Sequence, residues 1–143
     1  MISYRSDVRP GVDAIAAVYR AAPLFRPVLD TDRIQRMYDG SNVVVTAWDG
    51  DRLVGILRGL TDGAYDGYVC DLAIHSDYQG QGVGRGLLDE ATKSRPDVSW
   101  MLRASQIAID YYSHIGWQKV ENGWSLPGRR LNLETEWDGP PRA

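Results

Sequence analysis

The chain has few of the residues that form disulfides, zinc sites and nucleic-acid-binding surfaces. Its 143 residues include one cysteine and two histidines, so no disulfide can form within the chain and no zinc-ligand spacing occurs. The 16 Lys and Arg residues stand against 19 Asp and Glu, a net charge of −3, whereas nucleic-acid-binding domains usually carry a basic face. We therefore expect neither a metal nor a nucleic acid to take part in its function.

Long apolar runs are also missing. No stretch approaches the roughly 20 residues that a membrane-crossing helix needs, and the opening residues MISYRSDVRP hold no apolar signal core. We expect no membrane association and a cytoplasmic location. The length suits one compact domain, which we place at residues 1–137, followed by a frayed tail at 138–143.

Apolar spacing predicts strands and helices in the order βααβββαβαββ. The expected strands are 1–5, 42–48, 52–60, 68–75, 98–102, 117–122 and 129–137, and the expected helices begin near residues 10, 32, 83 and 105. The segment DGD at 49–51 separates two aliphatic runs and is typical of a hairpin, whereas the strand–helix–strand units of the second half predict parallel pairing. The fold class is therefore α+β, with one mixed, twisted sheet of about seven strands flanked by about four helices.

The segment YQGQGVGRG, residues 78–86, carries glycine at every second position from Gly80 to Gly86, between an expected strand and an expected helix. The N-terminus of a helix has unpaired N–H groups and a partial positive charge, and glycines let an anion such as pyrophosphate approach them. A tight turn that uses glycine for geometry alone would explain one glycine better than four. The dinucleotide pattern G-x-G-x-x-G and the P-loop pattern both fail here, so the loop predicts another phosphate-bearing ligand.

The pattern that the loop fits is Q/R-x-x-G-x-G/A, with Gln79, Gly82 and Gly84 at its fixed positions. This resembles motif A of the GNAT superfamily of N-acetyltransferases, in which the loop holds the pyrophosphate of coenzyme A. Residues 71–88 resemble that family's fourth strand, pyrophosphate loop and third helix. Residues 104–117 resemble its fourth helix and the start of its sixth strand.

Residues 51–65 resemble the family's second hairpin, particularly in its small bacterial members. Two residues depart from the common pattern: Ser76 stands where many members have Pro, and Ser105 where many have an Asn that contacts coenzyme A. Ser105 either hydrogen-bonds the cofactor or only caps the helix that follows. The resemblance extends over nearly the whole chain and implies an N-acetyltransferase that uses acetyl-CoA as its cosubstrate.

The resemblance also implies which residues hold coenzyme A. They are Leu72, Ala73 and Ile74 through their backbone, the loop residues Gln79, Gly80, Gln81, Gly82, Val83, Gly84 and Arg85, and the more distant Ser105 and Tyr112. The pantetheine arm would pair with the backbone of the first three as if it were an added strand. One N–H group there, that of Ile74, would polarise the thioester carbonyl.

Acetyl transfer from a thioester also requires that the departing thiolate gains a proton. The resemblance assigns this role to Tyr112. Tyr112 belongs as well to a helical stripe with Ala108, Tyr111 and Ile115, and a tyrosine in such a stripe is usually part of the core. We expect Tyr112 to be the catalytic member and Tyr111 the core member of this pair, because the family pattern divides them in that way.

The general base is not evident from the sequence. In related enzymes acidic or histidine side chains on the fourth strand serve, and Tyr68 and Cys70 occupy the matching positions here. Asp71 is adjacent, but strand alternation points it to the opposite face unless a bulge redirects it. Asp62, His75 and a chain of water molecules are alternatives, and Cys70 as an acylated nucleophile competes with its reading as a small buried strand residue.

The acceptor is expected to be a primary amine of a small molecule or a peptide, bound against the N-terminal helices. Phe25, Tyr38 and Trp48 are candidate wall residues and Arg26 could meet an acidic acceptor, although each is also typical of ordinary packing or surface. One alternative is a non-catalytic acyl-CoA-binding or regulatory module, and another is a purely structural domain. The exposed closing strands would also suit a homodimer.

Overall fold

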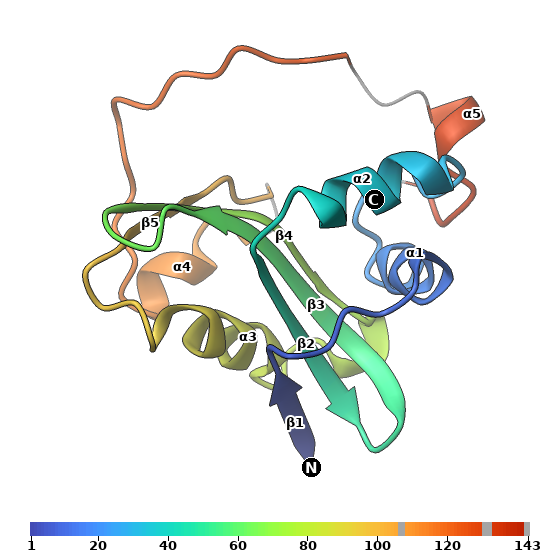
Figure 1. The fold of residues 1–143 in the computed structure, drawn as a ribbon, viewed down its shortest axis with the longest axis horizontal. Coiled ribbons are helices and arrows are strands. Elements are labelled where there is room, and N and C mark those ends of the chain that lie inside the picture. The colour runs from blue at the N-terminus through green and yellow to red at the C-terminus, as the bar shows by residue number, and fades with distance from the viewer. Residues whose placement is uncertain (106–107, 130–132, 142–143) are drawn as a thin grey trace.

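The computed structural model describes residues 1–105, 108–129 and 133–141 of the chain (Figure 1). Its elements are β1 (Ile2–Arg5), α1 (Val12–Ala21), α2 (Thr31–Asp39), β2 (Val43–Asp49), β3 (Arg52–Thr61), β4 (Asp66–Ile74), the 3-10 helix η1 (Ser76–Tyr78), α3 (Val83–Thr92), β5 (Ser99–Leu102), α4 (Tyr111–His114) and α5 (Leu133–Glu136). No helix in these residues is long and apolar enough to cross a bilayer.

One mixed sheet organises the fold. Within the described residues it has five strands in the order β1-β2-β3-β4-β5. The pairs β1/β2, β2/β3 and β3/β4 are antiparallel, and β5 runs parallel to β4. The expected α+β class, the hairpin and the parallel pairing of the second half are therefore confirmed.

The hairpin between β2 and β3 forms as the sequence predicted. Asp49 pairs with Arg52 across the turn, and Gly50 has a φ of 59°, in the left-handed region that glycine adopts without strain. The second expected helix also forms as α2, where the Asp30 side chain accepts a hydrogen bond from the Arg33 N–H at 3.1 Å and caps the helix start.

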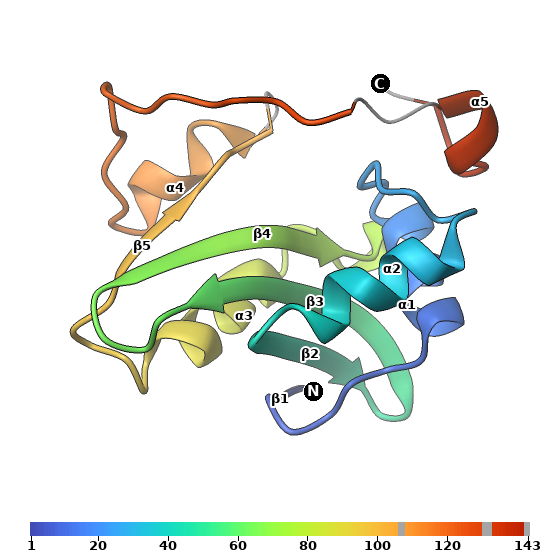
Figure 2. The ribbon, with the colours of Figure 1, turned by 45° about the horizontal axis from the view of Figure 1, so that its top comes forward.

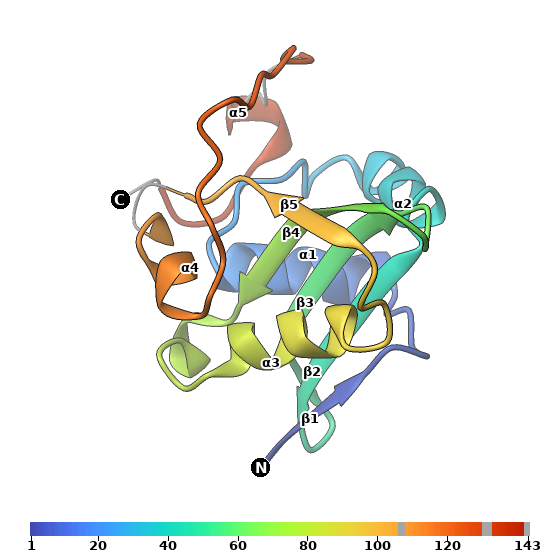
Figure 3. The same ribbon diagram turned by 90° about the vertical axis from the view of Figure 1, so that its left-hand side faces the viewer.

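Helices cover both faces of the sheet: α1 and α2 lie on one side and α3 and α4 on the other (Figure 3). Because successive strand residues point to opposite faces, neighbouring residues of β2 enter different cores. The core beneath α3 includes Val43, Val45, Leu57, Leu87 and Leu88, and the core beneath α1 and α2 includes Ile15, Ile34, Tyr38, Val44 and Ile56.

The two expected closing strands are wrong. Residues 117–129, which we call the crossing segment, run from α4 toward α5 in an extended conformation without strand pairing (Figure 2). The last expected strand, 129–137, is replaced in part by the helix α5, and its residues 130–132 lie outside the described part of the chain. The described residues thus hold five strands rather than about seven, and five α-helices rather than about four.

The reason is that the end of the chain docks on the N-terminal helices and not on the free edge of β5. Trp137 is 7% exposed and its ring meets that of Phe25 edge-on at 4.9 Å. Glu136 accepts hydrogen bonds from Arg33, at 3.5 Å, and from Arg129. Residues with high β propensity form a strand only where a neighbouring strand is available for pairing. The docking of the chain end on the N-terminal helices keeps it away from β5.

Candidate functional site

The strands β4 and β5 diverge after a short parallel pairing. β5 follows β4 only as far as Val69, while β4 continues along β3 to Ile74. The N–H of His75 donates to the carbonyl of Val54 at 2.8 Å. Because alternate residues of an antiparallel strand face the same neighbour, the backbone groups of Leu72 and Ile74 point away from β3 and into the gap. A cleft of about 510 Å³ lies there.

The glycine loop closes one end of this cleft. Gly80 and Gly82 have φ values of 76° and 82°, and Gly82 is the N-cap of α3. A Cβ at Gly82 would meet no atom within 4 Å, so glycine is needed there for the backbone conformation and not for space within the protein. The first N–H groups of α3 have no partner within the helix and carry its partial positive charge, which suits an anion.

The last glycine of the repeat serves packing instead. A Cβ at Gly86 would lie 2.1 Å from the ring of Tyr4, so this position admits the β1 tyrosine against α3. Gln79 also has a structural role, because its Nε2 donates to the carbonyls of Ala22 and Ile74, each at 2.9 Å. This side chain ties the end of α1 to the end of β4 beside the cleft.

Most residues that the sequence assigned to coenzyme A come together around the cleft. Those that line it are Leu72, Ile74, Gln79, Gly80, Gly82, Val83, Gly84, Ser105 and Tyr112. Three others do not: Ala73 is buried beneath α1, Gln81 donates to the carbonyl of Asp77 at 3.1 Å, and Arg85 is exposed on α3.

Further residues line the cleft that sequence reasoning did not single out. They are Leu24, Val69, Tyr78, Leu102 and Arg103. They come from separate segments of the chain, and no spacing in the sequence marks them. Only the fold brings them to one place. Ala108 and Tyr111 of the expected helical stripe line the cleft as well, so the expectation that Tyr111 belongs to the core is wrong: it is 37% exposed, whereas Tyr112 packs against the core.

Tyr112 enters the cleft from α4. Its ring lies 5.3 Å from that of Tyr111 and 5.9 Å from that of Trp117, and its hydroxyl makes no hydrogen bond with any residue that the structure describes. Burial, and to a lesser extent the neighbouring Tyr111, raises the pKa of this phenol. At neutral pH Tyr112 therefore holds a proton that it can donate.

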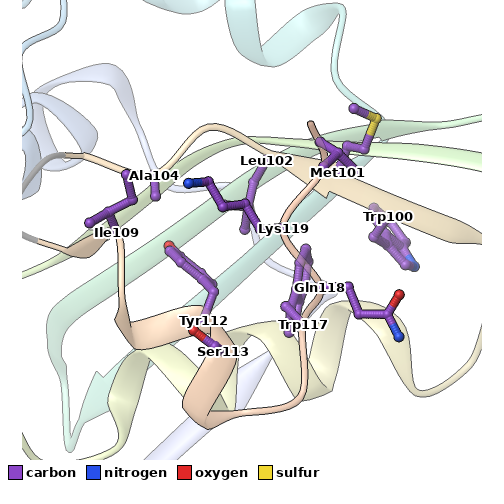
Figure 4. A pocket seen from close by; sticks show the side chains of 11 residues that line it. Trp100, Met101, Leu102, Ala104, Ile109, Tyr112, Ser113, Trp117, Gln118 and Lys119 are labelled. Carbon is purple, nitrogen blue, oxygen red and sulfur yellow. The ribbon is translucent and has the colours of Figure 1, made fainter. Parts of the chain in front are cut away.

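A smaller cavity of about 230 Å³ lies behind Tyr112, between β5 and the segment that follows α4 (Figure 4). Tyr112 and Leu102 line both spaces. The indole of Trp100 also lines the smaller one, and its Nε1 is buried without a hydrogen-bond partner among the described residues. Tyr112 thus stands between the two cavities, and its packing against the rings of Tyr111 and Trp117 agrees with the raised pKa that burial gives it.

A β-bulge places the strand residues that were candidates for the general base. Arg58 pairs with Asp71 and Gly59 with Val69, so Cys70 is the extra residue of β4. Cys70 lines the cleft, and burial raises the pKa of its thiol. An uncharged thiol is a poor base at neutral pH.

Asp71 points instead to the side of α1 and α2, where it is 1% exposed. Arg26 Nε donates to Oδ1 at 2.6 Å, and Arg58 Nε and the Tyr19 hydroxyl donate to Oδ2 at 2.6 Å each. The Tyr19 hydroxyl also lies 2.6 Å from that of Tyr38. Burial alone raises the pKa of Asp71, but the attraction of Arg26 and Arg58 outweighs it and holds the pKa below its usual value.

The alternative base candidates lie outside the cleft. Tyr68 is 37% exposed. Asp62 caps its own loop, accepting from the N–H groups of Ala64 and Tyr65 at 2.8 Å each. His75 accepts at Nδ1 from the N–H of Asp77 at 3.1 Å. None of these three side chains lines the cleft.

None of the three expected wall residues lines the cleft, whereas Arg26, expected to meet an acidic acceptor, does. Phe25 and Tyr38 pack in the core beneath α1 and α2, and the Trp48 indole donates to Thr46 Oγ1 at 2.7 Å. The described residues contain no group of three His, Cys, Asp or Glu side chains arranged to hold a metal.

Comparison with known proteins adds the family. Residues 15–126 match the model of the acetyltransferase (GNAT) domain. An uncharacterized ycf52-like N-acetyltransferase of Prochlorococcus marinus is 32% identical over 98 residues, which cover 64% of this chain and 54% of that protein. The chloroplastic GCN5-related N-acetyltransferase 2 of Arabidopsis thaliana is 27% identical over 75 residues, half of this chain and 29% of that protein. The chain thus spans about half the length of these curated relatives or less.

Solved structures share the fold. A probable acetyltransferase from meticillin-resistant Staphylococcus aureus superposes with a TM-score of 0.77 at 22% identity, over 92% of this chain and all of that one. The ribosomal-protein-S18-alanine N-acetyltransferase of Escherichia coli gives a TM-score of 0.70 at 19% identity, over 84% and 79% of the two chains. With the family model matching most of its length, the chain belongs to the GNAT family of acetyltransferases.

Proposed function

We propose that the chain transfers an acetyl group from acetyl-CoA to a primary amine of a small molecule or a protein. The observation that carries this proposal is a single cleft lined by the open strand residues Leu72 and Ile74, the glycines that open α3, and the phenol of Tyr112. These are the groups that acetyl transfer from a thioester requires, and they come from three separate elements of the fold.

Acetyl-CoA supplies the activated acetyl group. The N-terminus of α3, opened by Gly80 and Gly82, fits its pyrophosphate because the helix start favours an anion and no side chain stands in the way. The backbone groups of Leu72 and Ile74 fit the amides of the pantetheine arm in the manner of an added strand. The N–H of Ile74 then polarises the thioester carbonyl.

Tyr112 donates the proton that the leaving sulfur needs. Its hydroxyl is free of hydrogen bonds within the described residues, and its raised pKa keeps it protonated. No described residue that lines the cleft is Asp, Glu or His, so we assign removal of the amine proton to water. Asp71 positions Arg26 and Arg58 and does not act as the base.

The test is a pair of measurements on the whole chain. Acetyl-CoA should raise the melting temperature, whereas NAD at the same concentration should not. Thiol release should then follow on addition of amines from a panel that includes lysine peptides and small amines. No stabilisation by acetyl-CoA would contradict the proposal. Stabilisation without thiol release on any amine would support a non-catalytic acyl-CoA-binding module instead.

The homodimer expected from the sequence stays a prediction. Among the described residues no strand pairs with the outer edge of β5, and Val120, Trp124 and Leu126 of the crossing segment are exposed. An open strand edge beside exposed apolar side chains favours association with a second copy. Light scattering should give a dimer mass for the parent chain and a monomer mass for Trp124→Ser; a monomeric parent chain would contradict it.

A further inference from the structure

An excess of positive charge lies at the inner end of the cleft. Arg26 and Arg58 both bond Asp71, whose two oxygens they share with Tyr19. Arg9 lies behind them, donating to the carbonyls of Tyr38 and Ser41, and Arg58 also donates to Ser41 Oγ at 3.2 Å. Two guanidinium groups therefore share one carboxylate, and the third, that of Arg9, bonds only backbone carbonyls, in a chain whose overall charge is −3.

Arg26 brings this charge to the cleft itself. Its Nη2 donates to the carbonyl of Cys70 at 3.1 Å, and Cys70 lies on β4 at the point where β5 diverges. The Arg26 side chain is 29% exposed and lines the cleft. A guanidinium has five N–H donors, and the bonds of Arg26 to Asp71, Cys70 and Phe25 use three of them. It keeps donors for a ligand.

The charge of the cleft has one sign. Among its described lining residues Arg26 and Arg103 are cationic and none is Asp or Glu. The pyrophosphate of the donor would lie at the other end, by the glycines that open α3. That anion therefore does not account for Arg26. Asp71 balances one of the two charges of Arg26 and Arg58, and the remaining positive charge would repel a polycationic acceptor, because no described lining residue is Asp or Glu.

We infer that the acceptor is an amine that carries a carboxylate close to its amino group, as an α-amino acid does, and that Arg26 binds this carboxylate. The inference rests on the proposed acetyl transfer. Arg26 is held in place by Asp71 and by Cys70, so its fork is oriented before the acceptor arrives, and an oriented guanidinium matches a carboxylate with two parallel hydrogen bonds. Such an arrangement fixes both the identity of the acceptor and the direction from which its amine approaches.

The same charge bears on the proton of the amine. A carboxylate beside an ammonium raises the ammonium's pKa, and pairing with Arg26 offsets that negative charge, so the pKa of the bound ammonium falls. The amine then loses its proton to water more readily. This accounts for a cleft that has no described acidic or histidine side chain on its wall.

The test compares matched acceptors. The standard L-α-amino acids, their carboxamides and spermidine are assayed for thiol release with the whole chain and acetyl-CoA. The best amino acid should exceed its own carboxamide in kcat/KM by about tenfold to a hundredfold, the range of a charge-assisted hydrogen bond. Its KM should rise with added salt.

Arg26→Gln should reduce this ratio to near one while leaving the acetyl-CoA dissociation constant unchanged, and Arg26→Lys should keep part of it. Arg20→Gln removes a guanidinium that pairs with Asp138 on the surface and is the matched control. If Arg26→Gln does not fold, the acid-to-amide ratio of the parent chain decides alone.

Equal or better turnover of carboxamides or spermidine would overturn the inference and leave the proposed acetyl transfer intact. So would an Arg26→Gln variant that loses acetyl-CoA binding, because Arg26 would then serve the donor. Acetyl-CoA binding without turnover of any amine would instead refute the proposed function, and the inference with it.

Discussion

The two faces of the central sheet carry different kinds of chemical groups. On the side of α3, the core is apolar, and the part of the cleft wall beside this helix offers open backbone groups of β4, glycines and the start of a helix. On the side of α1 and α2, a similar apolar core encloses Asp71, Arg58 and two tyrosines joined by short hydrogen bonds. The first face leaves backbone groups open to a ligand, and the second holds its polar side chains in place.

This difference predicts which binding property of the cleft changes readily with single substitutions and which does not. A surface made of backbone accepts any ligand that has the right shape and charge, and suits a cosubstrate that a whole family shares. A surface made of side chains from β3, β4 and the segment before α2 changes with single substitutions. We therefore expect donor binding and acceptor choice to respond to different mutations.

The largest expected effect is a loss of acetyl-CoA binding on the side of the sheet covered by α3. Gly82→Val should abolish measurable acetyl-CoA binding in calorimetry, because a branched side chain would stand at the helix start where the anion binds. The φ of 82° also strains valine, at a cost of about 1–2 kcal/mol of stability.

Gly63→Val is the matched control for that strain. Gly63 has a φ of 76° and equally open surroundings, in the loop between β3 and β4 at the far end of β4. It should lose similar stability and keep acetyl-CoA binding. A Gly82→Val variant that binds as tightly as the parent would show that the loop is not the pyrophosphate site.

The next effect concerns chemistry and leaves both faces intact. Tyr112→Phe keeps the ring between the two cavities and removes the proton donor, so kcat should fall by roughly 10²–10⁴-fold. The melting temperature and the acetyl-CoA dissociation constant should change little. Tyr111→Phe, on the neighbouring ring of α4, is the control and should keep kcat. Comparable kcat in parent and Tyr112→Phe, on an acceptor for which thiolate departure limits the rate, would exclude Tyr112 as the acid.

A third prediction concerns stability on the side of the sheet covered by α1 and α2. Asp71→Asn leaves two guanidiniums without their carboxylate, and removing one partner of a buried ion pair costs about 3–5 kcal/mol. Urea unfolding should show this loss. Asp89→Asn, whose carboxylate is 71% exposed and 4.0 Å from Arg85, should lose less than about 1 kcal/mol. Equal losses for the two variants would mean that the buried network adds nothing to stability.

The same network sets the pH range of stability. Because the folded pKa of Asp71 lies below its unfolded value, its contribution is complete above roughly pH 4 and is lost as the pH falls further. Burial raises the pKa values of Tyr19 and Tyr38, so their contribution is complete below about pH 10 and is lost above it. Asp71→Asn should flatten the acid limb of the unfolding free energy, and an unchanged acid limb would assign it to other groups.

The smallest expected effect tests whether Ser105 belongs to the donor site. Ser105→Ala should weaken acetyl-CoA binding by about fivefold, the value of one neutral hydrogen bond, because Ser105 lines the cleft. Its melting temperature should stay within a degree or so of the parent's, since one exposed hydroxyl contributes little to folding. The helix α4 begins at Tyr111 with Asp110 as its N-cap, not Ser105. A lower melting temperature with unchanged binding would show that Ser105 serves the local fold and not the donor.

The sequence alone was enough for much of this protein. The alternation of apolar residues predicted all five observed strands and the helices α1, α2 and α3, because those periods are local. The alternating glycines from Gly80 to Gly86 predicted a helix start suited to an anion, because a helix N-terminus has unpaired N–H groups and glycine lets a ligand approach them. The helix does begin there, as α3, and the anion stays a prediction. The resemblance that these residues carried led to the family that the comparisons then established.

Only the tertiary structure decided the rest. Residues 117–122 and 129–137 were expected to be strands, but no local rule could say that Trp137 and Glu136 would dock on the N-terminal helices. No strand of the described residues then pairs with the outer edge of β5. Asp71 was a candidate base until its position beneath α1 showed it shared between Arg26 and Arg58. Arg26 and Asp71 are 45 residues apart in the chain. Their pairing, and the positive charge it brings to the cleft, follows from long-range packing that no period or motif encodes.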